Sequence, residues 1–376
     1  MPKSTTKKAL RIGVDARPVS RASLTGIGVY LNGLLNTLQE LDQENHYWLI
    51  SNGAIAFKIT NPRWEKIEGQ LPQKELSTLW MQCRIPCIAS SVGLDLFWGT
   101  RHQLPLLLSK NVRTVLTVHD IVHLLFPETM SLPVLATERL FMQRSLQRAD
   151  HVIADSWSTA SGIQDHYPVK AEKISVIYPG SPISADQIHP HAFDDEKLPE
   201  RYFLFVGTLE PRKNLKGILN AFSMLDPETK RLDLLVVGNV GWKNKELLAM
   251  LESNNFRSRV HLKGYVDPDR LSHMYQHAAC LLYPSLYEGF GFPILEAMHH
   301  GVPVITSNVS SMPEVAGDAA LLVDPADAHG LAEAMKKILL NDDLRNNMIL
   351  KGYERVAQFS WERCAEATLA VFNQWR

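Results

Sequence analysis

Short apolar runs alternate with longer amphipathic segments along the whole chain. Residues 10–14 (LRIGV) predict a buried strand, and the leucines of residues 30–41 recur at the spacing of one helix face. Further apolar runs predict strands at residues 47–50, 94–98, 112–118 and 151–154, and then at 202–206, 232–237, 260–262, 280–283 and 303–306. Fully apolar strands interleaved with helices are typical of a parallel sheet covered on both faces. The pattern therefore predicts an α/β protein.

These elements form two series, separated by a stretch without any period. Residues 178–182 read YPGSP, and polar residues continue to about residue 198, as expected of a linker. We predict two Rossmann-like, doubly wound parallel-sheet domains over residues 1–185 and 198–359. Because ligands of such sheets bind beyond the carboxyl ends of the strands, we expect the site in a central cleft that both domains face. Residues 360–376 predict a final helix with an apolar face of Trp361, Ala365, Leu369 and Phe372.

Composition narrows the class of protein further. With 376 residues, 45% of them hydrophobic and 21% charged, the chain can bury a large core and is not disordered, collagen-like or coiled-coil. The net charge of −1 gives no reason to expect nucleic-acid binding, although the first half is slightly basic. Four cysteines without a CxxC pair favour neither disulfides nor zinc. No signal peptide or membrane helix of ~20 apolar residues is visible, so a cytoplasmic protein is expected.

The strongest chemical motif follows the apolar run at residues 280–283. Gly289 and Gly291 would let backbone N–H groups approach an anion, and Pro293 suits the first turn of a helix whose N-terminus attracts negative charge. This predicts a diphosphate cradle, with Glu288 before the glycines and Glu296 one turn into the helix. The alternative is a tight strand-to-helix turn with two solvated carboxylates.

Two weaker motifs also follow predicted strands. Arg212 and Lys213 stand in GTLEPRKN after residues 202–206, and their cations suit a diphosphate, although such pairs are also common on surface turns. His119 and Asp120 end the run at residues 112–118. A lone histidine is more often a hydrogen-bonded structural residue than a catalytic one, and His123 competes for the same role.

A fourth motif is the loop of Gly26, Ile27 and Gly28, which lacks the third glycine of a dinucleotide fingerprint and equally suits close packing of a helix on a sheet. Together the four motifs and their order resemble the retaining glycosyltransferases of family 4, which have the GT-B fold. Glu288 and Glu296 match that family's E-x7-E motif, within SLYEGFGFPILEAMHHGVPVITSNVSSMPEVAG. FVGTLEPRKNL, VHLKGYVDPDRLSHMYQHA and TVHDIVHLLFPE resemble the family as well, and GTLEPRKN looks most like its mannosyltransferase branch.

The resemblance implies a role for each motif. Arg212 and Lys213 would bind the donor diphosphate and stabilise its developing charge, Glu296 would hold the ribose and Glu288 the sugar hydroxyls. The implied catalytic residues are His119, Glu288, Lys213 and Arg212. The implied donor-binding residues are Gly207, Arg212, Lys213, Gly264, Tyr265, Val266, Glu288, Gly289, Phe290, Gly291 and Glu296, and the loop residues facing donor and acceptor are Gly26, Ile27, Gly28 and Asp120.

The resemblance also implies the reaction. We expect a hexosyltransferase that moves mannose from GDP-mannose to a glycan or lipid-linked saccharide with retention, without a metal, another cofactor or a covalent enzyme intermediate. A donor of the UDP- or TDP-sugar type, a GT-B sugar-nucleotide epimerase and a binding protein on an inactive fold remain alternatives. Thr208 stands where many relatives have an arginine, so the division of roles between Arg212 and Lys213 stays open.

Further expectations concern partners and location. The partners would be the nucleotide sugar and the saccharide acceptor, with no nucleic acid. A peripheral contact between the N-terminal domain and the inner membrane face is left open. By analogy with proteins of the GT-B fold, the final helix is expected to return to the first domain.

Overall fold

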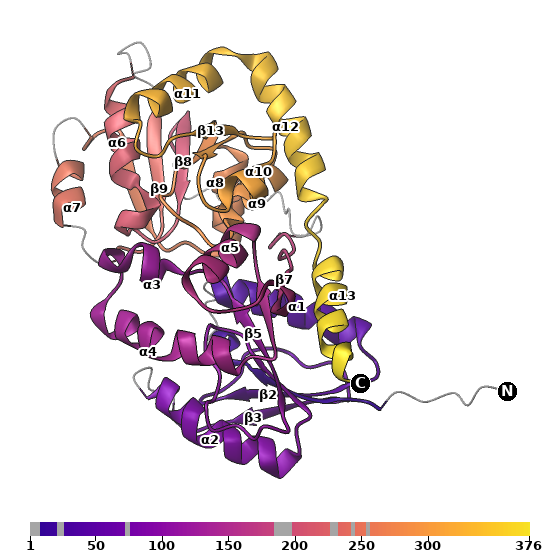
Figure 1. Cartoon of the computed structure of the whole chain (residues 1–376). Helices are drawn as coiled ribbons and strands as arrows, with labels where there is room; N and C mark the ends of the chain where they lie inside the picture. Colours follow the sequence, from indigo (N-terminus) through magenta and orange to yellow (C-terminus); the bar gives the residue numbers. More distant parts are fainter. Residues whose placement is uncertain are drawn as a thin grey trace. The chain divides into compact units, whose positions relative to one another are not determined.

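The computed structural model describes residues 8–20, 26–71, 76–183, 198–225, 232–241, 245–252 and 256–376 (Figure 1). Contacts divide the chain into two compact units. The first consists of Met1–Ile121, Pro133–Gly180 and Phe359–Arg376, and the second of Val122–Leu132 and Ser181–Gln358. Each unit is built on one parallel sheet, which confirms the predicted α/β class.

The first unit contains a seven-stranded sheet in the order β3-β2-β1-β4-β5-β6-β7. Its central strands are almost wholly buried, as their apolar runs predicted. The strands are β1 (Arg11–Asp15), β2 (His46–Ser51), β3 (Trp64–Glu68), β4 (Leu96–Gly99), β5 (Arg113–Val118), β6 (His151–Ala154) and β7 (Ile174–Val176).

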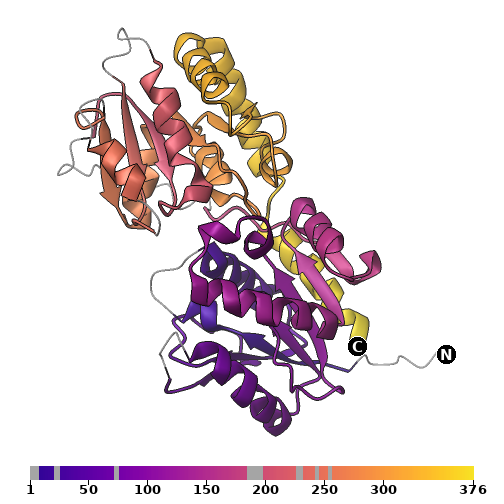
Figure 2. The same cartoon turned by 60° about the vertical axis from the view of Figure 1, so that its left-hand side comes forward.

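Helices cover both faces of this sheet (Figure 2). The main helices are α1 (Gly26–Leu41), α2 (Ser77–Val92), α4 (Leu132–Arg148), α5 (Trp157–His166) and α13 (Trp361–Phe372). Short 3-10 turns are η1 (Arg17–Val19), η3 (Ala171–Lys173) and η7 (Asn373–Trp375).

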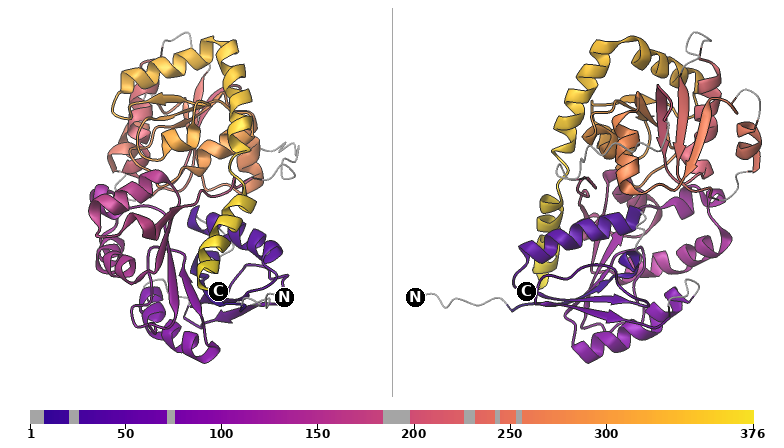
Figure 3. Two further views of the ribbon diagram at one scale, coloured as in Figure 1. Left: turned by 45° about the vertical axis from the view of Figure 1, so that its right-hand side comes forward. Right: turned by 180° about the vertical axis from the view of Figure 1, so that it is seen from behind.

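The C-terminal helix α13 packs beside α1 within the first unit (Figure 3). The indole of Trp361 fits against two glycines: a Cβ on Gly33 would lie 2.3 Å from the ring, and one on Gly180 would lie 2.5 Å from it. The predicted apolar face is partly shifted. Ala365 and Phe372 are buried, but Cys364, Thr368 and Val371 complete the buried face, whereas Trp361 and Leu369 are only half-buried.

The second unit has a six-stranded parallel sheet in the order β10-β9-β8-β11-β12-β13. The strands are β8 (Tyr202–Val206), β9 (Asp233–Val237), β10 (Val260–Gly264), β11 (Cys280–Tyr283), β12 (Val304–Ser307) and β13 (Leu321–Val323). The helices are α3 (Val122–Leu125), α6 (Leu215–Ser223), α7 (Lys245–Leu251), α8 (Pro268–Gln276), α9 (Phe292–His299), α10 (Met312–Ala316), α11 (Ala328–Leu340) and α12 (Asp342–Val356), with 3-10 turns η2 (Pro127–Thr129) and η5 (Pro211–Lys213).

The predicted domains, 1–185 with the returning final helix and 198–359, differ from the observed units at residues 122–132. Residues 122–132 group with the second unit, where the ring of Phe126 lies 5.8 Å from that of Tyr287. The predicted end of the first domain at residue 185 lies outside the described residues. Within the described ranges, no helix combines the length and the apolarity needed to cross a membrane.

Candidate functional site

Two loops of the second unit meet beyond the carboxyl ends of the neighbouring strands β8 and β11. Arg212 and Lys213 lie on η5, in the loop after β8, and the other loop follows β11. The N–H of Leu286 donates to the carbonyl of Arg212 at 2.8 Å, which joins the loops. Asn214, left-handed at φ 58°, caps α6 and donates to the carbonyl of Pro284 at 3.0 Å. The two loops therefore form one structure.

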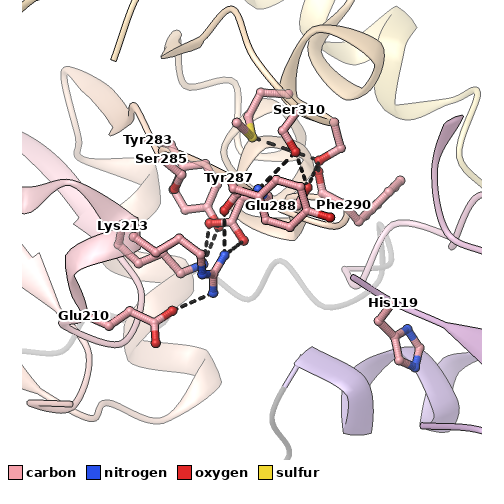
Figure 4. A network of polar contacts seen from close by, with 12 residues as sticks. His119, Glu210, Lys213, Tyr283, Ser285, Tyr287, Glu288, Phe290 and Ser310 are labelled. Atoms are coloured by element: carbon pink, nitrogen blue, oxygen red, sulfur yellow. Dashed lines mark hydrogen bonds and ion pairs between the residues drawn. The ribbon is translucent and has the colours of Figure 1, made fainter. Parts of the chain in front are cut away.

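The carboxylate of Glu288 is the centre of a buried ion-pair network (Figure 4). Its Oε2 accepts from the Arg212 guanidinium at 2.7 Å, and its Oε1 accepts from the Lys213 ammonium at 2.6 Å. The Tyr283 hydroxyl donates to the same Oε1 at 2.9 Å and accepts from Lys213 at 2.9 Å. Arg212 also pairs with Glu210 at 2.5 Å. Two cations thus face two carboxylates, and their formal charges cancel.

Burial and ion pairing oppose each other in this network. Burial by itself would raise the pKa of Glu288, but Arg212 and Lys213 outweigh it and hold that pKa at about 2. Burial lowers the pKa of Lys213, against the favourable charge of Glu288. Because the cations are fixed before any ligand arrives, they form a preorganised site for a group that gains negative charge.

The backbone around Glu288 is held by two consecutive serines. The hydroxyls of Ser310 and Ser311 donate to the carbonyl of Glu288, and Ser311 also donates to that of Phe290 at 2.6 Å. Gly291 follows with a φ of 119°, which side-chain-bearing residues rarely adopt, and α9 begins at the next residue. No described side chain caps this helix end, so its backbone N–H groups and dipole favour an anion.

Glu296 has a different environment from Glu288. It is half-buried on α9, and its Oε2 accepts from the Tyr275 hydroxyl at 2.7 Å. Burial raises the pKa of Glu296, and the Tyr275 hydrogen bond offsets part of that rise. The Tyr275 ring stacks on His300, with centroids 5.2 Å apart. Glu296 is thus a carboxyl group bound by a neutral partner, whereas Glu288 is bound by two cations.

The other predicted donor-binding residues of the β8 and β10 loops lie at the same edge of the sheet. Gly207, directly after β8, has a φ of 152°, and its N–H donates to the carbonyl of Val237 at 2.9 Å. Gly264 ends β10 with a φ of 64°, which favours glycine. Tyr265 is 57% exposed and Val266 is half-buried. The structure therefore brings the predicted donor-binding residues together on the second unit.

His119, at the end of β5 in the first unit, is held by protein groups at both ring nitrogens. Its Nδ1 lies 2.5 Å from Oδ2 of Asp155, and its Nε2 lies 2.8 Å from the carbonyl oxygen of Thr100. A carboxylate and a carbonyl are both acceptors, so each ring nitrogen of His119 faces an acceptor of the protein. The Tyr30 ring meets it edge-on, with centroids 4.9 Å apart. His119 and Asp155 form a buried hydrogen-bonded pair.

The remaining predicted residues also belong to the first unit. Gly26 and Ile27 begin α1, and Gly28 is buried in its first turn. A Cβ on Gly26 would meet nothing within 4 Å, so packing does not require a glycine there. Asp120 is half-buried beside His119.

Several residues at these sites were not among the sequence predictions. Glu210 and Asn214 flank the two cations in the same motif, so the sequence carried a signal for them. Tyr283 and His300 lie within five residues of the glutamates that they contact, but nothing in the pattern singled them out. The remaining residues meet their partners from positions more than 20 residues away: Asp155, Tyr275, Ser310 and Ser311. Across the described segments, no cluster of three or more His, Cys, Asp or Glu side chains has the arrangement of a metal site.

Comparisons with known proteins agree with this architecture. The family described as Glycosyl transferases group 1 matches residues 190–355, and the one described as Glycosyltransferase Family 4 matches residues 25–184. The structure of sucrose-phosphate synthase from Thermosynechococcus elongatus superposes with a TM-score of 0.79 at 22% identity, over 97% of this chain and 98% of that one. The fold is GT-B, as predicted, and the two matched models agree with the resemblance to glycosyltransferase family 4.

Two bacterial relatives are similar in sequence. O-antigen chain mannosyltransferase B from Escherichia coli is 41% identical over 173 residues, which are 46% of this chain and 45% of the relative. O-antigen chain mannosyltransferase RfbU from Salmonella typhimurium is 31% identical over 239 residues, which are 64% of this chain and 63% of the relative. The chain thus matches about half the length of the first relative and under two thirds of the second.

Proposed function

We propose that this chain is a retaining mannosyltransferase that takes mannose from GDP-mannose and adds it to a glycan or lipid-linked saccharide. The observation that carries the proposal is the partly buried pair of Arg212 and Lys213 around the buried Glu288, beside the N-terminus of α9. A diphosphate leaving group needs fixed positive charge where its own charge develops, and these groups supply it. The names of the two relatives support mannose as the sugar and polysaccharide synthesis as the process.

In this proposal the second unit binds the donor. Arg212 and Lys213 hold the diphosphate together with backbone N–H groups of residues 289–291, and Glu296 accepts from the ribose hydroxyls. Residues 264–266 lie along the nucleobase. Cations, backbone N–H groups and a carboxylate on the second unit support this assignment.

In the same proposal the first unit binds the acceptor, and His119 lies near the sugar and the acceptor. The loop of residues 26–28 and Asp120 faces donor and acceptor. The proposal includes a peripheral contact between the first unit and the inner membrane face, where a lipid-linked acceptor would be reached.

The proposed chemistry keeps the configuration of the anomeric carbon. The bond from that carbon to the diphosphate oxygen breaks, the acceptor oxygen attacks from the same face, and its proton passes to the leaving diphosphate. Glu288 stabilises the oxocarbenium-like transition state. Both ring nitrogens of His119 are hydrogen-bonded to protein groups, which supports the diphosphate rather than His119 as the base.

The test is transfer from GDP-mannose to a panel of saccharide acceptors, with released GDP and product stereochemistry as readouts. We expect an α-mannoside from the α-linked donor and no trapped glycosyl-enzyme. A β-mannoside or a covalent adduct would overturn the front-face mechanism. Epimerised nucleotide sugar without transfer would replace the transferase with an epimerase.

A further inference from the structure

The side chain of Tyr275 places a hydroxyl group in the protein interior, where packing alone would not require a polar group. The residue is fully buried at the end of α8, and its hydroxyl lies 2.7 Å from Oε2 of Glu296. Burying a hydroxyl and part of a carboxylate costs free energy that a phenylalanine at this position would avoid. The hydroxyl therefore has a purpose other than filling the core.

The ring of Tyr275 is fixed by a second aromatic residue. His300 stacks on it with the rings inclined by 14°. The His300 Nδ1 lies 2.7 Å from the backbone carbonyl of Glu296, so this nitrogen carries the proton, and Nε2 can accept from the Ser272 hydroxyl at 2.7 Å. Burial lowers the pKa of His300, in keeping with this neutral ring. The backbone and the carboxylate of Glu296 are thus both held by this aromatic pair.

The two carboxylate oxygens of Glu296 differ in their hydrogen bonding. Oε2 is occupied by Tyr275, whereas Oε1 accepts no hydrogen bond from any residue in the described part of the chain. A carboxylate that is fixed through one oxygen offers the other in a defined direction. Two neighbouring hydroxyls of a ribose need that defined direction, because hydrogen bonds to a charged acceptor depend on alignment.

We propose that Tyr275, fixed by its stack on His300, is a positioning residue that orients the Glu296 carboxylate toward the ribose hydroxyls of the donor. The inference rests on the proposed function, in which Glu296 binds the ribose. It adds a residue that touches no substrate and acts only through Glu296.

The experiment compares two ligands that differ only in these hydroxyls. Dissociation constants of GDP and 2′,3′-dideoxy-GDP are measured by titration calorimetry for the wild type and for Tyr275→Phe, Glu296→Gln and Tyr202→Phe. Tyr202 is the matched control, because its buried hydroxyl donates to the carbonyl of Met274 on α8 at 2.7 Å and not to Glu296. If the wild type prefers UDP, the uridine pair replaces the guanosine pair.

We expect Tyr275→Phe to weaken GDP binding about fivefold, the loss of one net hydrogen bond, and to leave dideoxy-GDP binding unchanged. Tyr202→Phe should keep the wild-type ratio of the two affinities. An equal loss for both ligands in Tyr275→Phe would reduce Tyr275 to a structural role and overturn the inference. The inference would also be overturned if Tyr275→Phe kept the wild-type ratio of the two affinities while Glu296→Gln lost it. In that case the ribose site itself would stand. An unchanged ratio in Glu296→Gln would overturn both the ribose site and the inference.

Discussion

Seven residues separate Glu288 from Glu296, but their neighbours give the two carboxylates opposite properties. Glu288 pairs with two buried cations and has its pKa lowered to about 2. Glu296 meets a tyrosine hydroxyl, and burial raises its pKa. The same residue type in one motif thus supports an ion-pair network at one end and a hydrogen-bond acceptor for neutral groups at the other.

The depressed pKa of Glu288 predicts a contribution to acid stability. The folded-state pKa lies below the ordinary value of 4.5, so the stabilisation is present above that value and is lost as the pH falls toward about 2. Glu288→Gln should cost about 3–5 kcal/mol near neutral pH, because two buried cations lose their partner. Its melting temperature should also fall less than that of the wild type between about pH 6 and about pH 3. If the melting temperatures of the wild type and of Glu288→Gln fell in parallel as the pH is lowered, the ion-pair network would not stabilise the protein as described.

Lys213 is predicted to act mainly on turnover. Lys213→Ala should lower kcat by about 10²–10³-fold, the loss expected for one preorganised charge-stabilising donor. Lys216→Ala is the matched control, because Lys216 pairs with Glu246 and its side chain is 53% exposed. Steady-state rates of GDP release distinguish the two variants. Equal rates in Lys213→Ala and the wild type would remove Lys213 from the chemistry.

At the scale of single residues, the sequence predicted the site residues that lie in a motif directly after a predicted strand. Arg212 and Lys213 follow a strand, and Glu288 precedes the glycines, so their grouping at one sheet edge could be inferred. Asp155 and Tyr275 could not, because each meets its partner only through the tertiary fold. The hydrogen bonds at both ring nitrogens of His119 also depend on distant partners.

At the scale of elements, the attachment of α13 depends on two positions without side chains. Gly33→Ala would place a Cβ 2.3 Å from the Trp361 ring, so we expect a loss of about 1–3 kcal/mol from overpacking. Gly26→Ala is the matched control in the same helix, since its Cβ would meet nothing within 4 Å. The midpoint of urea unfolding tests this. A Gly33→Ala variant as stable as the wild type would show that α13 is not held there.

The strands that the sequence missed share a physical reason. β3 and β7 are the edge strands of the first sheet, and β13 is one edge strand of the second, so each lacks one neighbour and is only partly buried. β3 reads WEKIE, with charges where a central strand has apolar residues, and β7 and β13 are three residues long. The central strands were predicted because burial on both faces imposes a continuous apolar run.

At the scale of the whole molecule, each unit is discontinuous in sequence. The final segment Phe359–Arg376 belongs to the first unit, and residues 122–132 to the second. The sequence could indicate two sheets and an amphipathic final helix, because these depend on local pattern. It could not indicate that residues 122–132 group with the second unit, because this grouping depends on tertiary contacts such as that of Phe126 with Tyr287.

The most direct test of the account is the affinity of the chain for intact nucleotide sugars. GDP-mannose, UDP-glucose, TDP-glucose and ADP-glucose are titrated into the wild type, Lys213→Ala and Lys216→Ala. The account predicts that GDP-mannose binds most tightly to the wild type. Lys213→Ala should weaken GDP-mannose binding about tenfold or more, as expected for the loss of a charge-assisted contact. Lys216→Ala should leave this affinity unchanged. Tighter binding of a UDP- or TDP-sugar would contradict GDP-mannose as the donor. Equal affinity of Lys213→Ala and the wild type for GDP-mannose would contradict the placement of the donor diphosphate at Lys213.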